Sequence, residues 1–423
     1  MQYIFKDQVA YNLHLIKTKK FKTVTIRVVF TSPIEKEELT MRSVLSDILL
    51  QSTDKYSSKR NMIIEAENLY AADIFNNTSR WGNNILTSFS LQVLNDKYTE
   101  EGNLKKSFEF LSEIIFKPDI IKDHFKEDKL SLVKNNCLIN MEEVKENYSE
   151  YALVRLKEAY DKNSPISYRL FGYKEDLDNI NEYNLYQYYT KMINTNLVDI
   201  YVVGDFNQKD MVNLVKDSFK FRKIKKSKPK YELPIKDARK RRLFAKEQVS
   251  NSQSKLGIIC PISKMKPYEK NYPMVLANII FGGGPDSVLF KNIREKNSLC
   301  YSISSSYSKL DNCLIITAGI DKANYDNALK GITDNLEAMK KGKFTDQDIN
   351  IAKELYNTAI NTIEESPNNL INEYLTEKVI GFENYKERDQ IMSSVTKKEI
   401  VKAFKKIKMD TVFLLEGDIN EED

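Results

Sequence analysis

One sequence pattern occurs twice in this chain of 423 residues. The strand-like segment TVTIRVVFTSPI (23–34) is followed by a helix-like stretch, and QSKLGIICPI (253–262) begins the second half in the same way. LVDIYVVGDF (197–206) and DTVFLLEGDI (410–419) come late in the two halves, and their Gly-Asp pairs lie 213 residues apart. Because solenoids repeat every ~20–50 residues, a period of this length predicts a duplicated domain.

Both halves mix strands and helices without regular alternation. The segments 84–94 (NILTSFSLQVL) and 313–320 (CLIITAGI) are strand-like, and each precedes a helical stretch. Several strands alternate apolar and polar residues, which is typical of a sheet with one face in solvent. The sequence therefore predicts an α+β fold of two tandem, homologous α/β-roll domains, each with a largely antiparallel sheet and helices packed on one face.

A strongly basic segment separates the two halves. Residues 220–246 carry 13 Lys and Arg against two acidic residues, so the rest of the chain is mildly acidic although the formal net charge is +5. The segment also holds two prolines and little apolar periodicity, which is typical of a linker. We therefore predict a first domain at 1–219, a basic linker at 220–246 and a second domain at 247–423. A phosphate contact by the linker stays open, but the missing aromatic platform disfavours nucleic-acid binding.

Composition argues against several classes of protein. No apolar run approaches the roughly 20 residues of a membrane span, and the first residues lack the apolar segment of a secretory signal peptide. The four cysteines lie far apart and form no C-x-x-C pair, which argues against a disulfide framework or a cysteine zinc site. We therefore expect a cytoplasmic protein with no membrane partner.

The string FGGGPDSVLFKNIREKNSLCYSI (281–303) is the most distinctive in the chain. Gly282, Gly283 and Gly284 follow a helix-like stretch, and no Lys-Ser or Lys-Thr comes behind them, as a phosphate-binding loop requires. We therefore interpret the glycines as a sharp turn between two helices. Cys300 lies among apolar neighbours, and we interpret it as a small core residue rather than a nucleophile.

With the tandem halves and the VVGD ending of the first half, this string resembles the M16 metallopeptidases, the family of pitrilysin, insulinase and mitochondrial processing peptidase. The short two-domain branch fits best, and the resemblance spans nearly the whole chain. It implies an H-x-x-E-H motif on the first helix of the first half, where two histidines on one helix face bind zinc and the glutamate deprotonates the attacking water. A glutamate from a later helix completes the family's zinc site.

This chain lacks the motif on the matching helix, RSVLSDILLQST. Aligned through the final Ser-Thr, the H-x-x-E-H positions fall on Ser43, Ser46 and Asp47, while the apolar residues of the helix are kept. The third-ligand region falls near Lys134, Asn135 and Asn136, where no glutamate stands. Serine is not a zinc ligand in such sites, and one aspartate does not make a site. We therefore predict no metal and no cofactor in this chain.

The chain contains two histidines, His14 and His124. We expect His14 in a strand of the first hairpin and His124 at the start of a helix. His124 and Glu127 are three residues apart, a spacing that suits a metal pair on a helix, but a surface position is favoured. Neither H-x-x-E-H nor H-E-x-x-H can be written with these two residues, so we do not expect the isolated chain to be a peptidase.

Arg294 and Tyr301 match positions at which the family carries an arginine and a tyrosine in its second half. The resemblance implies that these side chains face the zinc site, hold the substrate and stabilise the oxyanion. Attack on an amide places negative charge on the carbonyl oxygen, which a phenol and a guanidinium stabilise. Without the resemblance, Arg294 is interpreted as an ion-pair partner of Glu295 and Tyr301 as a packing residue. The resemblance also links Gly282–Gly284 with substrate handling, as a role secondary to the structural one.

A missing zinc motif beside a kept Arg/Tyr pair predicts one subunit of a split enzyme. The partner is an H-x-x-E-H-containing paralogue that holds zinc, and the substrate is a peptide. Within the family the chain is most similar to the zinc-motif-lacking proteins of Gram-positive bacteria that are associated with elongation factor P 5-aminopentanol modification. The alternative is a non-enzymatic peptide-binding or scaffold protein that keeps the fold. Homodimer formation by the isolated chain stays open.

Overall fold

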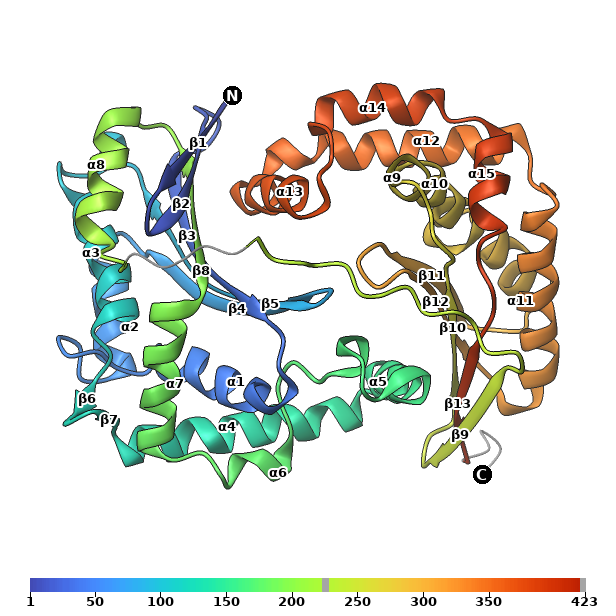
Figure 1. The fold of residues 1–423 in the computed structure, drawn as a ribbon, viewed down its shortest axis with the longest axis horizontal. Helices are drawn as coiled ribbons and strands as arrows, with labels where there is room; N and C mark the ends of the chain where they lie inside the picture. Colours follow the sequence, from blue (N-terminus) through green and yellow to red (C-terminus); the bar gives the residue numbers. More distant parts are fainter. Residues whose placement is uncertain (223–227, 419–423) are drawn as a thin grey trace. The chain divides into compact units, whose positions relative to one another are not determined.

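A computed structural model describes residues 1–222 and 228–418 (Figure 1). The contacts divide the chain into two compact units. The first unit comprises Met1–Glu142, Arg169–Tyr231 and Glu364–Tyr374, and the second comprises Glu143–Tyr168, Glu232–Ile363 and Leu375–Asp423. This grouping differs from a single division at the basic linker, because one segment from each half of the chain counts with the other unit.

The first unit is built on a six-stranded sheet. All its neighbouring strands are antiparallel except β2 and β8, which run parallel. The strand order across the sheet is β1 (Gln2–Gln8), β2 (Tyr11–Lys17), β8 (Leu197–Gly204), β3 (Thr23–Pro33), β5 (Asn84–Leu94) and β4 (Asp73–Trp81).

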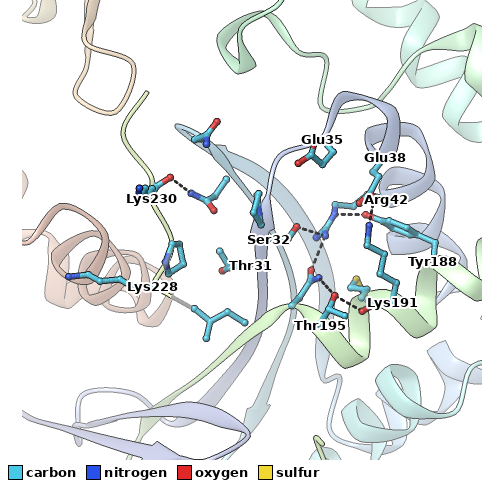
Figure 2. A pocket seen from close by; sticks show the side chains of 17 residues that line it. Thr31, Ser32, Glu35, Glu38, Arg42, Tyr188, Lys191, Thr195, Lys228 and Lys230 are labelled. Carbon is cyan, nitrogen blue, oxygen red and sulfur yellow. Dashed lines mark hydrogen bonds and ion pairs between the residues drawn. The ribbon is translucent and has the colours of Figure 1, made fainter. Parts of the chain in front are cut away.

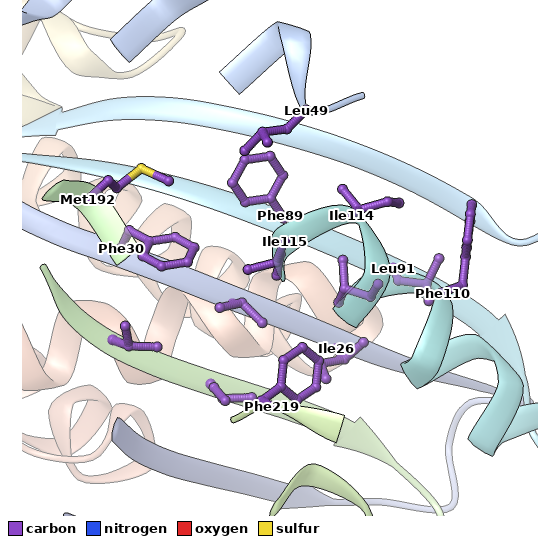
Figure 3. Packing of buried hydrophobic residues seen from close by; sticks show 14 of the residues in the cluster. Ile26, Phe30, Leu49, Phe89, Leu91, Phe110, Ile114, Ile115, Met192 and Phe219 are labelled. Atoms are coloured by element: carbon purple, nitrogen blue, oxygen red, sulfur yellow. The ribbon is translucent and has the colours of Figure 1, made fainter. Parts of the chain in front are cut away.

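One face of this sheet carries the core of the first unit. Phe30 and Phe89 from the strands meet Ile114 and Met192 from the helices, and all four are buried (Figure 3). The helices of the first unit are α1 (Leu39–Ile48), α2 (Lys59–Asn68), α3 (Asn103–Phe116), α4 (Glu127–Glu146), α6 (Lys174–Leu177), α7 (Glu182–Thr195) and α8 (Gln208–Ser218), with a small hairpin of β6 (Ile120–Ile121) and β7 (His124–Phe125) before α4.

The opposite face of the first sheet is polar and is partly covered by residues 364–374. Arg27 of β3 donates from its two terminal nitrogens to Asn372 Oδ1 and Asn368 Oδ1, both at 2.7 Å. Tyr3 of β1 stacks on Tyr374 with ring centroids 4.1 Å apart. A segment far along the chain therefore covers part of the face that the alternating pattern predicts to be in solvent.

The second unit is built on a five-stranded sheet in which β9 and β13 are the parallel pair. The order is β11 (Ser302–Ser308), β12 (Cys313–Ile320), β10 (Ser254–Pro261), β13 (Thr411–Gly417) and β9 (Leu243–Val249). This order repeats β4-β5-β3-β8-β2 of the first sheet, and the parallel pair occupies the same place. The predicted α+β fold with two homologous, largely antiparallel halves is confirmed.

Helices cover both faces of the second sheet. Phe281 and Phe404 meet edge to face in the main core, with centroids 5.1 Å apart, while α5 packs against β10 and β13 from the other face. The helices are α5 (Tyr148–Asp161), α9 (Pro267–Asn271), α10 (Pro273–Asn278), α11 (Tyr325–Lys340), α12 (Asp346–Asn361), α13 (Pro367–Ile380), α14 (Tyr385–Ser394) and α15 (Lys397–Phe404), and the first residues of α13 count with the first unit.

The basic segment 220–246 is only partly a solvated connector. Residues 223–227 lie outside the described part of the chain. Tyr231 and Leu233 are buried, and β9 begins at Leu243, so the end of the segment is part of the second sheet.

Candidate functional site

Helix α1 is folded as a metal-binding helix would be, but it carries no zinc-binding histidines. Val44, Leu45 and Ile48 are buried in the core of the first unit, as the apolar pattern predicts. Ser43 and Ser46 are buried as well, and Asp47 is half-buried. The helix forms without a zinc motif because its apolar face packs into the core.

The residues that align with the family's zinc motif form hydrogen bonds within the first unit. The Ser46 hydroxyl donates to the Ser43 carbonyl at 2.9 Å. Asn76 of β4 donates from Nδ2 to the Ser46 carbonyl at 2.8 Å and to Asp47 Oδ1 at 3.0 Å. These contacts tie α1 to the outer strand of the sheet and engage one of the two oxygens of the Asp47 carboxylate.

Cys137 of α4 is the residue that faces Asp47 from the third-ligand region. Its Sγ lies 3.9 Å from Asp47 Oδ2. Burial, and then the negative charge of Asp47, raise the pKa of this thiol to about 12, so it stays protonated and is a poor metal ligand at neutral pH. In the predicted third-ligand region, Lys134 donates to the Ile180 carbonyl at 3.0 Å.

The residues at α1 do not fit a zinc ion. Serine hydroxyls, one carboxylate and a protonated thiol are not the donor set of a zinc site. Across residues 1–222 and 228–418, no three or more His, Cys, Asp or Glu side chains gather closely enough to hold a metal ion.

His14 lies in β2, in the first hairpin as predicted. It is buried, its Nδ1 lies 2.8 Å from the Tyr3 hydroxyl, and its Nε2 lies 3.0 Å from Asp199 Oδ1. The ring also stacks on Tyr201 at 4.2 Å. Both ring nitrogens are therefore engaged in a structural network on the polar face of the first sheet.

The prediction that His124 opens a helix is wrong. His124 lies in the short strand β7, and α4 begins three residues later at Glu127. Its Nδ1 lies 2.9 Å from the Phe125 carbonyl oxygen, and its ring packs on Tyr183 at 4.8 Å. The strand geometry removes the helical spacing on which a His124–Glu127 metal pair depends.

A polar pocket of about 540 Å³ lies in the first unit, lined by residues around Arg42 (Figure 2). Arg42 directly precedes Ser43 and is 2% exposed. Its guanidinium donates to the hydroxyls of Tyr188, Thr87 and Ser32 and to Asn196 Oδ1, at 2.8–3.1 Å. A buried cation with several neutral acceptors holds α1 to α7 and the sheet. The sequence analysis missed this role, because nothing local distinguishes Arg42 from a surface arginine.

Arg294 and Tyr301 are both exposed side chains of the second unit. Arg294 lies in the π-helical turn Phe290–Glu295, with its guanidinium carbon 4.8 Å from the Phe290 ring centroid. Burial raises the pKa of the Cys300 thiol, and the positive charge of Arg294 opposes that effect, so Arg294 lies near the residue that precedes Tyr301. Within the described part of the chain Arg294 stacks on Phe290 and forms no ion pair with Glu295.

Tyr301 directly precedes β11, the outer strand of the second sheet. Its side chain is 44% exposed, and its backbone N–H donates to the Gly319 carbonyl at 2.8 Å. Its hydroxyl donates to Asp321 Oδ1 at 2.6 Å. Asp321 was missed by the sequence analysis, although its place directly after a strand that pairs with β11 is a usable signal.

The glycine run lies where one helical segment ends and the chain turns into the next, as predicted, and it is also a packing feature. Gly282 and Gly283 lie in the π-helical turn Ile279–Gly283, and none of the three glycines has a positive φ. A Cβ on Gly282 would lie 2.7 Å from Ser305 Oγ and 2.9 Å from Ser305 N, so only glycine lets this turn approach β11. At Gly282 it is the close approach to β11, and not a positive φ, that requires glycine.

None of the described helices combines the length and the apolarity that a membrane span requires.

Two homologous sheet units form an M16-like fold, and within the described residues no group of three or more His, Cys, Asp and Glu side chains could hold a metal ion. Residues 179–356 match the family model described as the peptidase M16 inactive domain. This part of the chain is therefore similar to the inactive-domain members of the M16 peptidase family.

Several known proteins are similar to the chain over nearly all of its residues. A protein of Bacillus subtilis (strain 168) named "Probable inactive metalloprotease YmfF" is 27% identical over 410 residues, which cover 96% of this chain and 95% of that protein. A conserved protein from Enterococcus faecalis V583 has a solved structure with a TM-score of 0.90 and 29% identity, covering 100% of both chains. A peptidase M16 inactive domain from Pseudomonas fluorescens has a TM-score of 0.81 at 16% identity, covering 100% of this chain and 99% of that one, which supports the fold.

Proposed function

We propose that the chain is the non-zinc-binding subunit of a heterodimeric M16-type peptidase. A partner of the same family carries H-x-x-E-H and the zinc ion, and this chain supplies Arg294 and Tyr301 to the shared site. The observation that carries the proposal is the exposed phenol of Tyr301, which is held by Asp321 just before an outer strand. It coexists with a first helix in which Ser43, Ser46 and Asp47 align with the positions of the zinc motif.

The two side chains suit the charge that develops during peptide hydrolysis. When water attacks an amide carbon, the carbonyl oxygen becomes an oxyanion, and donors already aimed at it stabilise the transition state. The Tyr301 hydroxyl can turn from Asp321 Oδ1 toward such an oxygen, and the exposed Arg294 guanidinium adds a positive charge in the same segment. Loss of one such donor typically lowers kcat roughly 10²- to 10³-fold, which sets the size of the expected effect.

A peptide substrate can be bound by strand addition. β4 is the end strand of the first sheet and pairs with β5 alone among the described strands, so its outer edge is open to a further strand. Asn76 of β4 bonds to the ligand-position residue Asp47, so a peptide added here lies beside α1. Main-chain hydrogen bonds supply affinity in this mode, and side-chain pockets supply specificity.

The test is peptide cleavage by a mixture of this chain with an H-x-x-E-H-containing paralogue. We expect Arg294→Ala and Tyr301→Phe each to lower the cleavage rate at saturating peptide, without changing assembly measured by light scattering. The matched controls are Arg60→Ala and Tyr183→Phe, which alter exposed residues of the first unit. If the two site variants cleave as fast as the controls, the shared-site proposal fails.

A non-enzymatic peptide-binding or scaffold role is the alternative outcome of the same experiment. Tight peptide binding by the isolated chain, with no effect on cleavage by any paralogue, supports that alternative. A cytoplasmic location belongs to the proposal as well, because the four cysteines are free and buried, as thiols in a reducing compartment are.

A further inference from the structure

A second site lies in the second unit, away from the residues assigned above to peptide hydrolysis. It is a hollow of about 560 Å³, called the basic concavity below. Three chain segments contribute its basic residues: Arg239, Lys240 and Arg242 before β9, Lys340 at the end of α11, and Lys405, Lys406 and Lys408 between α15 and β13.

Three of these cations are neutralised within the unit. Arg239 pairs with the fully buried Asp410. Lys340 lies 2.9 Å from Glu337, and Lys406 lies 2.9 Å from Glu269. These three cations therefore have a structural role in the fold.

Four cations are left over. Lys240, Arg242, Lys405 and Lys408 are exposed, and in the described ranges none of them forms an ion pair. Among the residues that line the basic concavity, Glu337 is the only acid, and it is already paired. Exposed cations that converge on a hollow without counter-charges favour an anionic ligand, because their mutual repulsion is relieved when it binds.

The lysines on one side come from a rigid turn. The Ser263 amide donates to the Lys406 carbonyl at 3.1 Å, and the Lys408 amide donates to the Pro261 carbonyl at 3.2 Å. Ile262 and Ile407 form an isolated bridge between the same two segments. The backbone that carries Lys405 and Lys408 is therefore fixed before a ligand arrives, which lowers the entropy cost of binding.

Compensation of helix dipoles explains only some of the basic residues of the concavity. Lys340 ends α11, and Lys405 directly follows α15, so both compensate the negative ends of helix dipoles. Lys240 and Arg242 belong to the chain segment between Tyr231 and β9, where no helix occurs. An anion is the simplest common partner of these cations.

We propose that the basic concavity binds a compact oligophosphate, such as a di- or triphosphate chain. Two phosphate groups carry roughly three to four negative charges at neutral pH, which matches the four unpaired cations. Guanidinium and ammonium groups are the side chains that recognise phosphate. No aromatic residue lines the basic concavity, so it offers no stacking platform for a base, which disfavours single-stranded RNA or DNA.

Isothermal titration with inorganic tripolyphosphate tests the proposal. We expect binding that weakens as salt rises, and a Kd at least tenfold higher for Lys405→Glu/Lys408→Glu and for Lys240→Glu/Arg242→Glu. The matched control, Lys59→Glu/Arg60→Glu, makes the same change of charge at exposed residues of the first unit and should bind normally. Circular dichroism melting confirms that all three variants remain folded.

Titration with ATP decides the source of the phosphate. ATP binding as tightly as tripolyphosphate shows that the phosphate chain alone is recognised, and tighter ATP binding assigns the site to a nucleotide. The proposal is overturned if tripolyphosphate does not bind at millimolar concentration or if the control variant loses as much affinity as the site variants. It is also overturned if a single-stranded RNA or an acidic peptide binds more tightly than either phosphate compound. The test needs no peptidase partner, so its outcome is independent of the proposed function.

Discussion

Replacement of Arg42 by methionine tests whether this buried cation holds the degenerate helix in place. Arg42 is 2% exposed, and its guanidinium makes four hydrogen bonds at 2.8–3.1 Å. Thr87 keeps a second partner, because its hydroxyl lies 3.1 Å from that of Thr78. The acceptors on Tyr188, Ser32 and Asn196 each lose the bond to Arg42.

The expected loss of stability is smaller than it would be for a side chain that water cannot reach. Leaving a buried polar group without its hydrogen-bond partner typically costs about 1–3 kcal/mol. Here the three acceptors line the polar pocket of about 540 Å³, where water can replace the guanidinium (Figure 2). We therefore expect Arg42→Met to lower the free energy of unfolding of the first unit by about 2–4 kcal/mol.

The chain itself supplies the probe for this measurement. Its one tryptophan, Trp81, lies at the end of β4, so fluorescence during urea unfolding reports on the first unit. Arg60→Met is the matched control on the exposed surface of α2, and we expect a change below about 0.5 kcal/mol for it. A change for Arg42→Met as small as that of the control would refute the assigned role.

Three further predictions concern the second unit. Asp321→Asn should raise the cleavage rate of the paired enzyme by up to about 5-fold, because the neutral amide oxygen accepts from the Tyr301 hydroxyl more weakly than the carboxylate, and an exposed charge-assisted bond contributes at most roughly 1 kcal/mol; kinetics in the Tyr301→Phe background, where the effect should vanish, check this. Gly282→Ala should lower the free energy of unfolding by about 1–3 kcal/mol through overpacking against β11, measured by urea unfolding followed by circular dichroism. Two lysines that hydrogen-bond to Glu269 lower the pKa of its carboxyl to about 2 from 4.5, so its stabilisation is complete above pH 4.5 and is lost as pH falls toward 2. Thermal melts of Glu269→Gln should accordingly differ from wild type at pH 7 and converge with it near pH 2.

The duplicated sheet could be predicted because its strands carry local signals. The segments at 23–34 and 253–262 became β3 and β10, and those at 84–94 and 313–320 became β5 and β12. Alternation and β-branched residues mark such strands without reference to the rest of the chain. The parallel pairing of β9 with β13 was not predictable, because β9 begins inside a basic segment whose composition is that of a linker.

The positions of the side chains around the candidate site could not be predicted from the sequence, because tertiary contacts determine them. Cys137 faces Asp47 from a different helix, and Asp321 accepts from Tyr301 across a strand pair. Residues 364–374 count with the first unit although they come late in the chain. Sequence spacing shows which residues share one helix face, but not which distant element packs against that face.

The zinc content of the purified chain tests the central claim most directly. We hold that this chain has no zinc site of its own, because Ser43, Ser46 and Asp47 align with the positions of the zinc motif and burial raises the pKa of the Cys137 thiol beside Asp47. Elemental analysis after dialysis against micromolar zinc should find far less than one zinc per chain, while an H-x-x-E-H-containing paralogue treated in parallel retains about one. One zinc retained per chain, and lost on Asp47→Ala, would contradict the account.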